Sequence, residues 1–321
     1  MNICLVTPAP AGSRKGNRVT ALRWAKRLRE LGHRARLRED LADGDAAGAG
    51  WDVVIGLHAR KSAPAVARAV AAGIPTIVAL TGTDLYDDLP RSPEALRALE
   101  LAQRIVTLQP LAARALPPEL RGRARAIVQS ARAVAGEPPD PRRFDVCVLG
   151  HLREVKDPLR AAAAARLLPP ESRLRVLQVG GALGDEWAEA ARAEAEANPR
   201  YEWLGERPRA DALAILARCR LLAVTSRLEG GANVISEALA ARVPVVSSRI
   251  DGSVGILGED YPGYFPVGDT AALASLLERC ERDGAFLRAL ADRCERLRPL
   301  VDPAREREGW KALLAEISSG R

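Results

Sequence analysis

Two glutamates bracket a pair of glycines in the stretch EGGANVISE, which runs from Glu229 to Glu237. The stretch follows RLLAVTS, an apolar run with the length of a buried strand. Gly230 and Gly231 would let the backbone approach a ligand closely, and Asn233 can cap a helix that begins there. The free amides of such a helix start bind anions such as pyrophosphate. Glu237, one turn into the helix, would accept hydrogen bonds from the two hydroxyls of a ribose, and Glu229 would reach the group beyond the phosphates. The alternative is that both acids are solvated residues at a helix start.

Polar residues also follow three apolar runs in the first half of the chain. The first loop, PAPAGSRKGNR, matches neither G-x-G-x-x-G nor a P-loop, and it holds Gly12, Arg14, Lys15 and Gly16. The next two loops, GLHARKS and LTGTDLYDD, supply His58, Arg60, Lys61, Thr83 and Asp84. Ligands of open parallel sheets collect at the carboxyl ends of the strands, so these residues are candidates for a second pocket. Its arginines and lysines suit an anionic ligand. The alternatives are a solvated loop at residues 12–16 and a helix or turn cap for Asp84.

Both sets of loops must be positioned by short apolar runs that alternate with longer amphipathic stretches. The first half of the chain has such runs at residues 2–8, 51–58, 75–82 and 104–110. The pattern restarts in the second half, at residues 144–150, 174–181, 220–226 and 244–249. Runs that are apolar throughout and separated by helices predict parallel sheets covered on both faces. The sequence therefore predicts an α/β fold of two doubly wound, Rossmann-like domains that face a cleft.

The boundary between the two domains is predicted at residues 134–143, whose prolines and charges cannot build a packed element. A chain of 321 residues also exceeds what one hydrophobic core usually serves. The predicted domains are residues 1–133 and 144–302, with a C-terminal helix at about 303–321 that packs back on the first domain.

The composition is that of a soluble globular protein, with 47% hydrophobic and 28% charged residues. A net charge of +7 could indicate nucleic acid, but the arginines are spread through helix-like stretches beside nearly as many acids. Aromatic residues are only 4% of the chain, so we expect no nucleic-acid partner. Small anionic substrates explain the positive charge equally well.

The chain offers no signal for a membrane, a disulfide or a metal. It has no run of roughly 18 apolar residues, and its start, MNICLVTPAP, lacks the charged region of a signal peptide. Its cysteines form no C-x-x-C pair and fit reduced thiols: Cys4, Cys147, Cys219, Cys280 and Cys294. Carboxylates and histidines show no metal-ligand spacing. We therefore expect a cytoplasmic protein without stable membrane association and without a metal or other cofactor.

The stretch EGGANVISE, after a strand in the second of two such domains, resembles the E-x7-E motif of the family 4 retaining glycosyltransferases of the GT-B fold. The resemblance covers nearly the whole chain. It implies that Glu229 contacts the donor sugar and that Glu237 holds the nucleotide ribose. The segment SSRIDGSVGILGEDYPGYFPVGD resembles the family segment that packs against the donor sugar and diphosphate, which implies backbone amides from Gly252, Ser253 and Val254.

The stretch LGHLREVKDPLRAA resembles the phosphate-binding loop of the same family, in which Gly-Arg-Leu is followed four residues later by lysine. Lys156 matches the lysine, but His151 stands where the arginine belongs. Arg153 could supply the missing guanidinium, which binds phosphate oxygens in a bidentate fork. The alternative for these residues is an exposed loop without a ligand.

Two loops of the first domain also resemble GT-B enzymes. The loop with Gly12 and Gly16 resembles the glycine-bearing loop that faces the cleft from the acceptor side. In the region of His58, many GT-B enzymes have a histidine that touches the donor sugar. The resemblance thus implies that the first domain binds the acceptor and that His58 takes part in catalysis.

Three motifs together resemble one narrow subgroup, the selenosugar synthases of selenoneine biosynthesis: PAPAGSRKGNRVTALRWAKRLRELGH, GHLREVKDPLRAA and EGGANVISEALAARVPVVSSRIDGSVGILGEDYPGYFPVGD. The resemblance implies that selenophosphate attacks the anomeric carbon of UDP-N-acetylglucosamine and gives a 1-seleno sugar, UDP and phosphate. The residues alone indicate a nucleotide-sugar transferase with an anionic acceptor.

Three alternatives stay open from the sequence. A UDP-N-acetylglucosamine 2-epimerase on the same double-Rossmann plan would need no acceptor. A nucleotide-sugar-binding module would bind without turnover. A glycosyltransferase could also use another small acceptor, although the chain lacks the amphipathic helix, rich in lysine and aromatics, that a lipid transferase would use at a membrane. The oligomeric state stays open as well.

Overall fold

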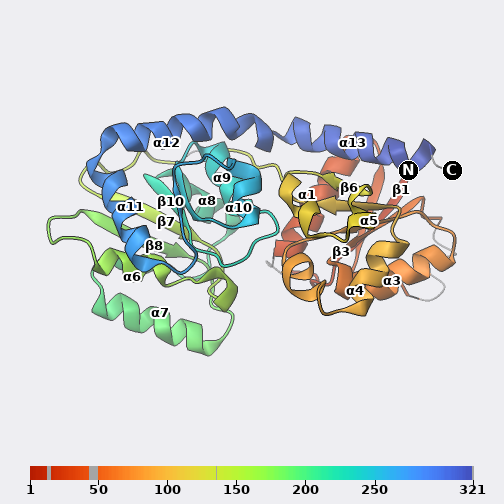
Figure 1. The fold of residues 1–321 in the computed structure, drawn as a ribbon, viewed down its shortest axis with the longest axis horizontal. Coiled ribbons are helices and arrows are strands. Elements are labelled where there is room, and N and C mark those ends of the chain that lie inside the picture. The colour runs from red at the N-terminus through yellow and green to blue at the C-terminus, as the bar shows by residue number, and fades with distance from the viewer. Residues whose placement is uncertain (13–15, 43–49, 135, 320–321) are drawn as a thin grey trace. The chain divides into compact units, whose positions relative to one another are not determined.

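The computed structural model describes residues 1–12, 16–42, 50–134 and 136–319, and its contacts divide the chain into two compact units (Figure 1). The first unit comprises Met1–Gln129, Glu229–Gly231 and Pro303–Arg321. The second comprises Ser130–Leu228 and Ala232–Asp302. Within the described residues each unit has a six-stranded sheet in which all neighbouring strands are parallel. The predicted α/β fold with two parallel sheets is therefore confirmed.

The sheet of the first unit has the strand order β2-β1-β3-β4-β5-β6. Its strands are β1 (Asn2–Val6), β2 (Arg34–Arg38), β3 (Val53–Leu57), β4 (Thr76–Ala79), β5 (Arg104–Thr107) and β6 (Ala124–Ala126). The interior strands β3 and β4 are buried along their whole length, as their apolar runs predict. The α-helices are α1 (Gly16–Glu30), α3 (Ala59–Ala71), α4 (Pro93–Leu101) and α5 (Pro118–Arg121). A π-helix η1 (Asp84–Asp88) and a 3-10 helix η2 (Pro110–Ala115) follow β4 and β5.

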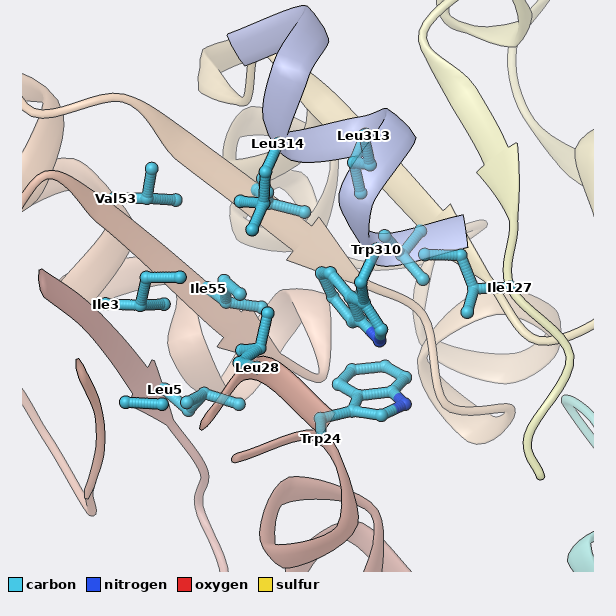
Figure 2. Close-up of a cluster of buried hydrophobic side chains, with 14 of the residues drawn as sticks. Ile3, Leu5, Trp24, Leu28, Val53, Ile55, Ile127, Trp310, Leu313 and Leu314 are labelled. Atoms are coloured by element: carbon cyan, nitrogen blue, oxygen red, sulfur yellow. The ribbon is translucent and has the colours of Figure 1, made fainter. Parts of the chain in front are cut away.

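The C-terminal helix α13 (Pro303–Ser319) completes the core of the first unit by packing on α1 (Figure 2). The rings of Trp24 and Trp310 meet edge to face, with 4.9 Å between their centroids. Beside them the buried carboxylate of Glu306 accepts a hydrogen bond from Nε1 of Trp24 at 3.0 Å. The same carboxylate forms ion pairs with Arg23 at 3.3 Å and Arg27 at 3.5 Å, which offset the cost of its burial.

The sheet of the second unit has the strand order β12-β11-β10-β7-β8-β9. Its strands are β7 (Phe144–Leu149), β8 (Leu174–Val179), β9 (Tyr201–Trp203), β10 (Leu221–Val224), β11 (Val245–Ser248) and β12 (Tyr264–Phe265). The α-helices are α6 (Arg160–Arg166), α7 (Asp185–Ala197), α8 (Arg209–Ala217), α9 (Asn233–Ala241), α10 (Asp251–Leu257), α11 (Thr270–Arg282) and α12 (Gly284–Leu297). Two 3-10 helices, η3 (Glu154–Lys156) and η4 (Arg298–Val301), complete the unit.

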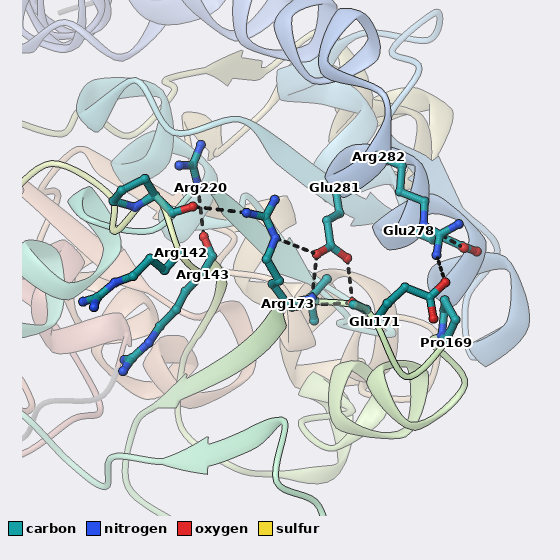
Figure 3. Close-up of polar contacts among 12 residues, drawn as sticks. Arg142, Arg143, Pro169, Glu171, Arg173, Arg220, Glu278, Glu281 and Arg282 are labelled. Carbon is teal, nitrogen blue, oxygen red and sulfur yellow. Dashed lines mark hydrogen bonds and ion pairs between the residues drawn. The ribbon is translucent and has the colours of Figure 1, made fainter.

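The segment that precedes β7 is hydrogen-bonded to the second unit. The guanidinium of Arg173 donates to the carbonyl of Pro141 and that of Arg220 to the carbonyl of Arg143, both at 3.3 Å (Figure 3). Glu281 of α11 accepts from Ser172 Oγ at 2.6 Å and from the amide of Arg173 at 2.7 Å. Residues 136–143 form no regular structure, but the carbonyls of Pro141 and Arg143 are held by these hydrogen bonds, and the contacts group residues 136–143 with the second unit.

No helix in the described part of the chain is both long enough and apolar enough to cross a membrane.

Candidate functional site

A hollow opens at the carboxyl ends of β7, β8 and β10 in the second unit, where the sequence predicts a phosphate site. Its polar lining includes His151, Lys156, Gln178, Thr225 and Ser226. Thr225 Oγ1 donates to the carbonyl of Lys156 at 2.9 Å, which fixes the end of η3 against the strand β10. The hollow thus combines a lysine with hydroxyl and amide groups, a set that suits an anion.

The structure separates the two candidates for the missing family arginine. His151 is half-buried and lines the hollow, and its Nδ1 lies 3.3 Å from the carbonyl of Gly181. Arg153 is also half-buried, but it is not among the described residues that line the hollow. The structure therefore brings Lys156 together with His151 and leaves Arg153 beside them in the same loop.

Gln178 lies at the hollow without having been predicted. Its side chain is 1% exposed, and its Nε2 donates to the carbonyl of Gly150 at 3.2 Å, in the loop that leads to His151. Its Oε1 has no hydrogen-bond partner among the described residues. The sequence signal is the glutamine in LRVLQVGG, an amide within a mostly apolar run, because such a residue seldom enters a buried strand without a reason.

Helix α9 carries Glu237 into the interior of the second unit. The five residues 235–239 are all buried, so the helix is surrounded by protein at this point. The side chain of Glu237 is 5% exposed, and its Oε1 forms an ion pair with Nη2 of Arg209, at the start of α8, at 2.6 Å. A carboxylate in such a place needs a charged partner. The sequence did not identify Arg209, because the contact joins two helices and leaves no local pattern.

The start of α9 differs from the prediction for Asn233. Asn233 is the first residue of the helix, Ala232 takes the N-cap position, and no side chain caps it. The predicted cap is therefore wrong, because the backbone turns into the helix one residue earlier. Glu229 and Gly231 are half-buried and Gly230 is buried in the loop before α9, and the contacts group these three residues with the first unit.

Backbone amides at the start of α10 are predicted to contact the donor sugar and diphosphate, but two of them make hydrogen bonds within the protein. Gly252, Ser253 and Val254 are buried, and the amides of Ser253 and Val254 both donate to the carbonyl of Ile250 at 2.9 Å. The hydroxyl of Ser253 accepts from Ser247 Oγ at 2.8 Å. The amides of Ser253 and Val254 are thus used within the turn, and the expectation that they bind phosphate is corrected.

In the first unit, Asp84 organises the loops that follow β3 and β4. Its carboxylate is fully buried and accepts hydrogen bonds from the amides of Ala59 at 3.0 Å and of Thr81 and Gly82 at 2.8 Å. These contacts fit the alternative of a helix and turn cap, and the place of Asp84 in an acceptor pocket stays a prediction. Thr83, beside it, is half-buried at the start of η1.

His58 lies next to Asp84, at the point where β3 passes into α3. It is 3% exposed, and its φ of 74° is a conformation that residues other than glycine seldom adopt. Its Nε2 lies 3.5 Å from Oδ2 of Asp88, whereas Nδ1 has no partner in the part of the chain that the structure describes. Burial above all lowers the pKa of His58. The charge of Lys61 and then that of Arg60 act in the same direction, against the opposing effects of Asp84 and Asp88.

The predicted cations of the first unit are only partly described. Arg60 is about half exposed and pairs with Asp88 at 3.1 Å, and Lys61 is exposed beside it. Arg14 and Lys15 lie outside the described residues. They are flanked by Gly12, with φ 80°, and by Gly16, the first residue of α1.

Among the described residues, no group of three or more histidine, cysteine, aspartate or glutamate side chains is arranged to hold a metal ion.

Comparisons with known proteins place this architecture among enzymes that handle sugars. The model of the family described as "Glycosyl transferases group 1" matches residues 131–297. No curated protein matches the sequence. The chain is similar to the structure of HepE from Anabaena in complex with UDP-glucose, with a TM-score of 0.77, 17% identity and coverage of 99% of this chain and 100% of that one.

Two further structures share the fold. Sucrose-phosphate synthase from Thermosynechococcus elongatus matches with a TM-score of 0.80 and 14% identity, over 100% of both chains. The α,α-trehalose 6-phosphate synthase from Burkholderia multivorans matches with a TM-score of 0.68 and 16% identity, over 94% of this chain and 74% of that one.

Proposed function

The chain belongs to the group 1 glycosyltransferases, and on that premise we propose that it transfers a sugar from a UDP-sugar, UDP-N-acetylglucosamine, to selenophosphate. Its two parallel-sheet, Rossmann-like domains are those of the GT-B glycosyltransferases. The observation that carries the proposal is the pairing, within one unit, of a lysine-lined hollow at the strand ends with a buried glutamate one turn into the next helix.

The donor is proposed from this half of the site and from a neighbour. Lys156 would meet the diphosphate charge and Glu237 would accept the ribose hydroxyls. HepE, which shares the fold, has been solved with UDP and with UDP-glucose. A uridine diphosphate sugar is therefore the donor class we propose, and N-acetylglucosamine follows from the resemblance of the motifs to selenosugar synthases.

The reaction we propose exchanges two bonds at the anomeric carbon. The bond from this carbon to the diphosphate oxygen breaks, and a bond to selenium forms. Water then cleaves the selenium–phosphorus bond and releases phosphate. As the ring becomes oxocarbenium-like, charge grows on the leaving diphosphate, and Lys156 stabilises that charge.

We propose that the Lys156 cation suffices without a metal, so activity should persist in EDTA. Loss on chelation, restored by magnesium or manganese, would contradict that part.

The acceptor is proposed on the resemblance, together with the chemistry of the first unit. A selenium nucleophile needs no strong base, whereas a sugar hydroxyl calls for one. His58, with its lowered pKa, would be neutral at neutral pH, and its buried Nδ1, which has no partner among the described residues, would contact the sugar. Arg60 and Lys61 would attract the phosphate group of the acceptor.

The proposal is tested by mass spectrometry of the products from the purified chain. The donors would be UDP-N-acetylglucosamine and UDP-glucose, each with selenophosphate, with phosphate and with no acceptor. We expect a 1-seleno sugar and UDP only with selenophosphate. A changed sugar without acceptor would indicate an epimerase. UDP-sugar binding without any product would indicate a binding module, and turnover with other acceptors alone would sink the selenophosphate assignment.

A further inference from the structure

We propose that Arg209 is a positioning residue that holds the Glu237 carboxylate in place for the ribose hydroxyls, so that it makes the site selective for a nucleotide with an intact ribose. This inference rests on the proposed function, because it takes Glu237 as the ribose ligand. It adds a residue from a different helix, in a stretch that carries none of the motifs.

The burial of Glu237 creates the need for such a residue. Its helix is buried from Ile235 to Leu239, and its side chain is 5% exposed. An ionised carboxylate loses most of its hydration there. A charged partner with good hydrogen-bond geometry offsets the free-energy cost of that loss. The 2.6 Å contact from Arg209 Nη2 to Glu237 Oε1 has the length of a strong charge-assisted hydrogen bond.

The contact from Arg209 involves one oxygen of the carboxylate. It reaches Oε1 of Glu237, and an ionised carboxylate can accept hydrogen bonds at about four positions on its two oxygens. The side chain of Arg209 is 51% exposed, so it reaches the carboxylate from the surface. On this proposal, the two neighbouring hydroxyls of a ribose bind to a carboxylate whose plane the ion pair holds in one orientation.

Fixing that orientation is the role we assign to Arg209. Without it the carboxylate would turn, and the diol would lose its two aligned acceptors. The loss should appear as weaker binding of any nucleotide that has the diol. It should be absent for a nucleotide that lacks both hydroxyls. A general disturbance of the helix would weaken both nucleotides alike.

The test measures binding of UDP and of 2′,3′-dideoxyuridine 5′-diphosphate to the full chain by calorimetry. We expect Arg209→Ala to weaken UDP binding by about tenfold, the lower end for a hydrogen bond to a charged group. Binding of the dideoxy nucleotide should not change. Arg209→Lys should recover part of the loss. In a Glu237→Gln background, Arg209→Ala should have no further effect, because the partner charge is gone.

A matched control comes from the pair Arg282 and Glu171 (Figure 3). Its N–O distance is also 2.6 Å and its arginine is 50% exposed, but its carboxylate is 68% exposed and carries no predicted ligand. Arg282→Ala should leave the binding of both nucleotides unchanged.

Three results would overturn the inference. The first is Arg209→Ala binding UDP as tightly as the unmodified chain. The second is an equal loss for UDP and the dideoxy nucleotide in a variant whose thermal unfolding is unchanged. The third is no UDP binding by the unmodified chain, which would overturn the proposed donor as well. The first two leave the donor proposal standing, so the two failures are distinguishable.

Discussion

At the scale of the residue, Lys156 carries the charge that the proposed reaction needs. It lines the hollow at the strand ends, and its carbonyl is anchored by Thr225. We expect Lys156→Ala to lower kcat by about 10²- to 10³-fold with a smaller change in the donor KM, because the opposing charge grows in the transition state.

Arg153→Ala is the matched comparison for Lys156, because Arg153 belongs to the same loop without lining the hollow. Steady-state kinetics of both variants at varied donor would decide between them. A larger loss of kcat for Arg153→Ala would assign it the role of the missing family arginine. An effect of Lys156→Ala on KM alone would show that Lys156 does not act on the leaving group.

His58 gives a prediction about stability and pH. Its pKa in the folded chain is lowered, chiefly by burial, below the usual value of 6.5. Folding therefore favours its neutral form over the charged one. The resulting contribution to stability is fully present above about pH 6.5 and is lost as the pH falls through the lower folded pKa. We expect the free energy of unfolding, from urea titrations between about pH 8 and pH 5, to fall more steeply in the unmodified chain than in His58→Asn. Identical slopes would mean that the pKa of His58 does not change on folding.

The residues that the sequence could predict are those that a local pattern places at a strand end. Lys156 lies in the loop after β7 and Glu237 in the helix after β10, so the parallel sheet places both beyond the carboxyl ends of these strands. Arg209 was missed because its partner lies on another helix. Asn233 was misplaced by one position because several polar and small residues near a helix start can serve as its first residue.

At the scale of the element, a single carboxylate joins the turn after β4 to the start of α3. Asp84 accepts hydrogen bonds from three amides, those of Ala59, Thr81 and Gly82. In Asp84→Asn, an NH2 group would replace one acceptor oxygen and leave a buried amide facing a donor. We expect a loss of about 2 to 3 kcal/mol in the free energy of unfolding, measured by urea denaturation.

Asp87→Asn is the control for Asp84 in the same π-helix. Asp87 is 56% exposed and pairs with Arg91 one turn away, so its change should cost less than about 0.5 kcal/mol. If Asp84→Asn lowers the free energy of unfolding as little as the control does, the loops after β3 and β4 keep their structure without the carboxylate.

The elements that the sequence missed are the edge strands. β2 reads RARLR, in which a charged side chain at every second position masks the apolar run that marks the interior strands. It pairs with β1 over five residues all the same, because an edge strand needs only one covered face. β12 has two residues, too few for any pattern.

At the scale of the whole molecule, Glu306 joins the C-terminal helix to the first. It is 2% exposed beside Arg27, which is 4% exposed. We expect Glu306→Ala to lower the free energy of unfolding by about 3 kcal/mol, because it leaves a buried guanidinium without this partner. The exposed Glu308, on the same helix, gives the matched control Glu308→Ala, which should unfold like the unmodified chain. Equal thermal unfolding of the two variants would contradict the role of Glu306.

The return of α13 to the first unit fixes an order of events during synthesis. The hydrogen bond from Trp24 to Glu306 joins residues 282 positions apart. The second unit, which ends at Asp302, is therefore complete before the first, although the ribosome makes the first unit's sheet earlier. Until α13 emerges, the nascent chain carries an uncovered face with Trp24 and Leu28, the kind of surface that chaperones bind. The unit that contains the N-terminus is thus the last to complete its fold.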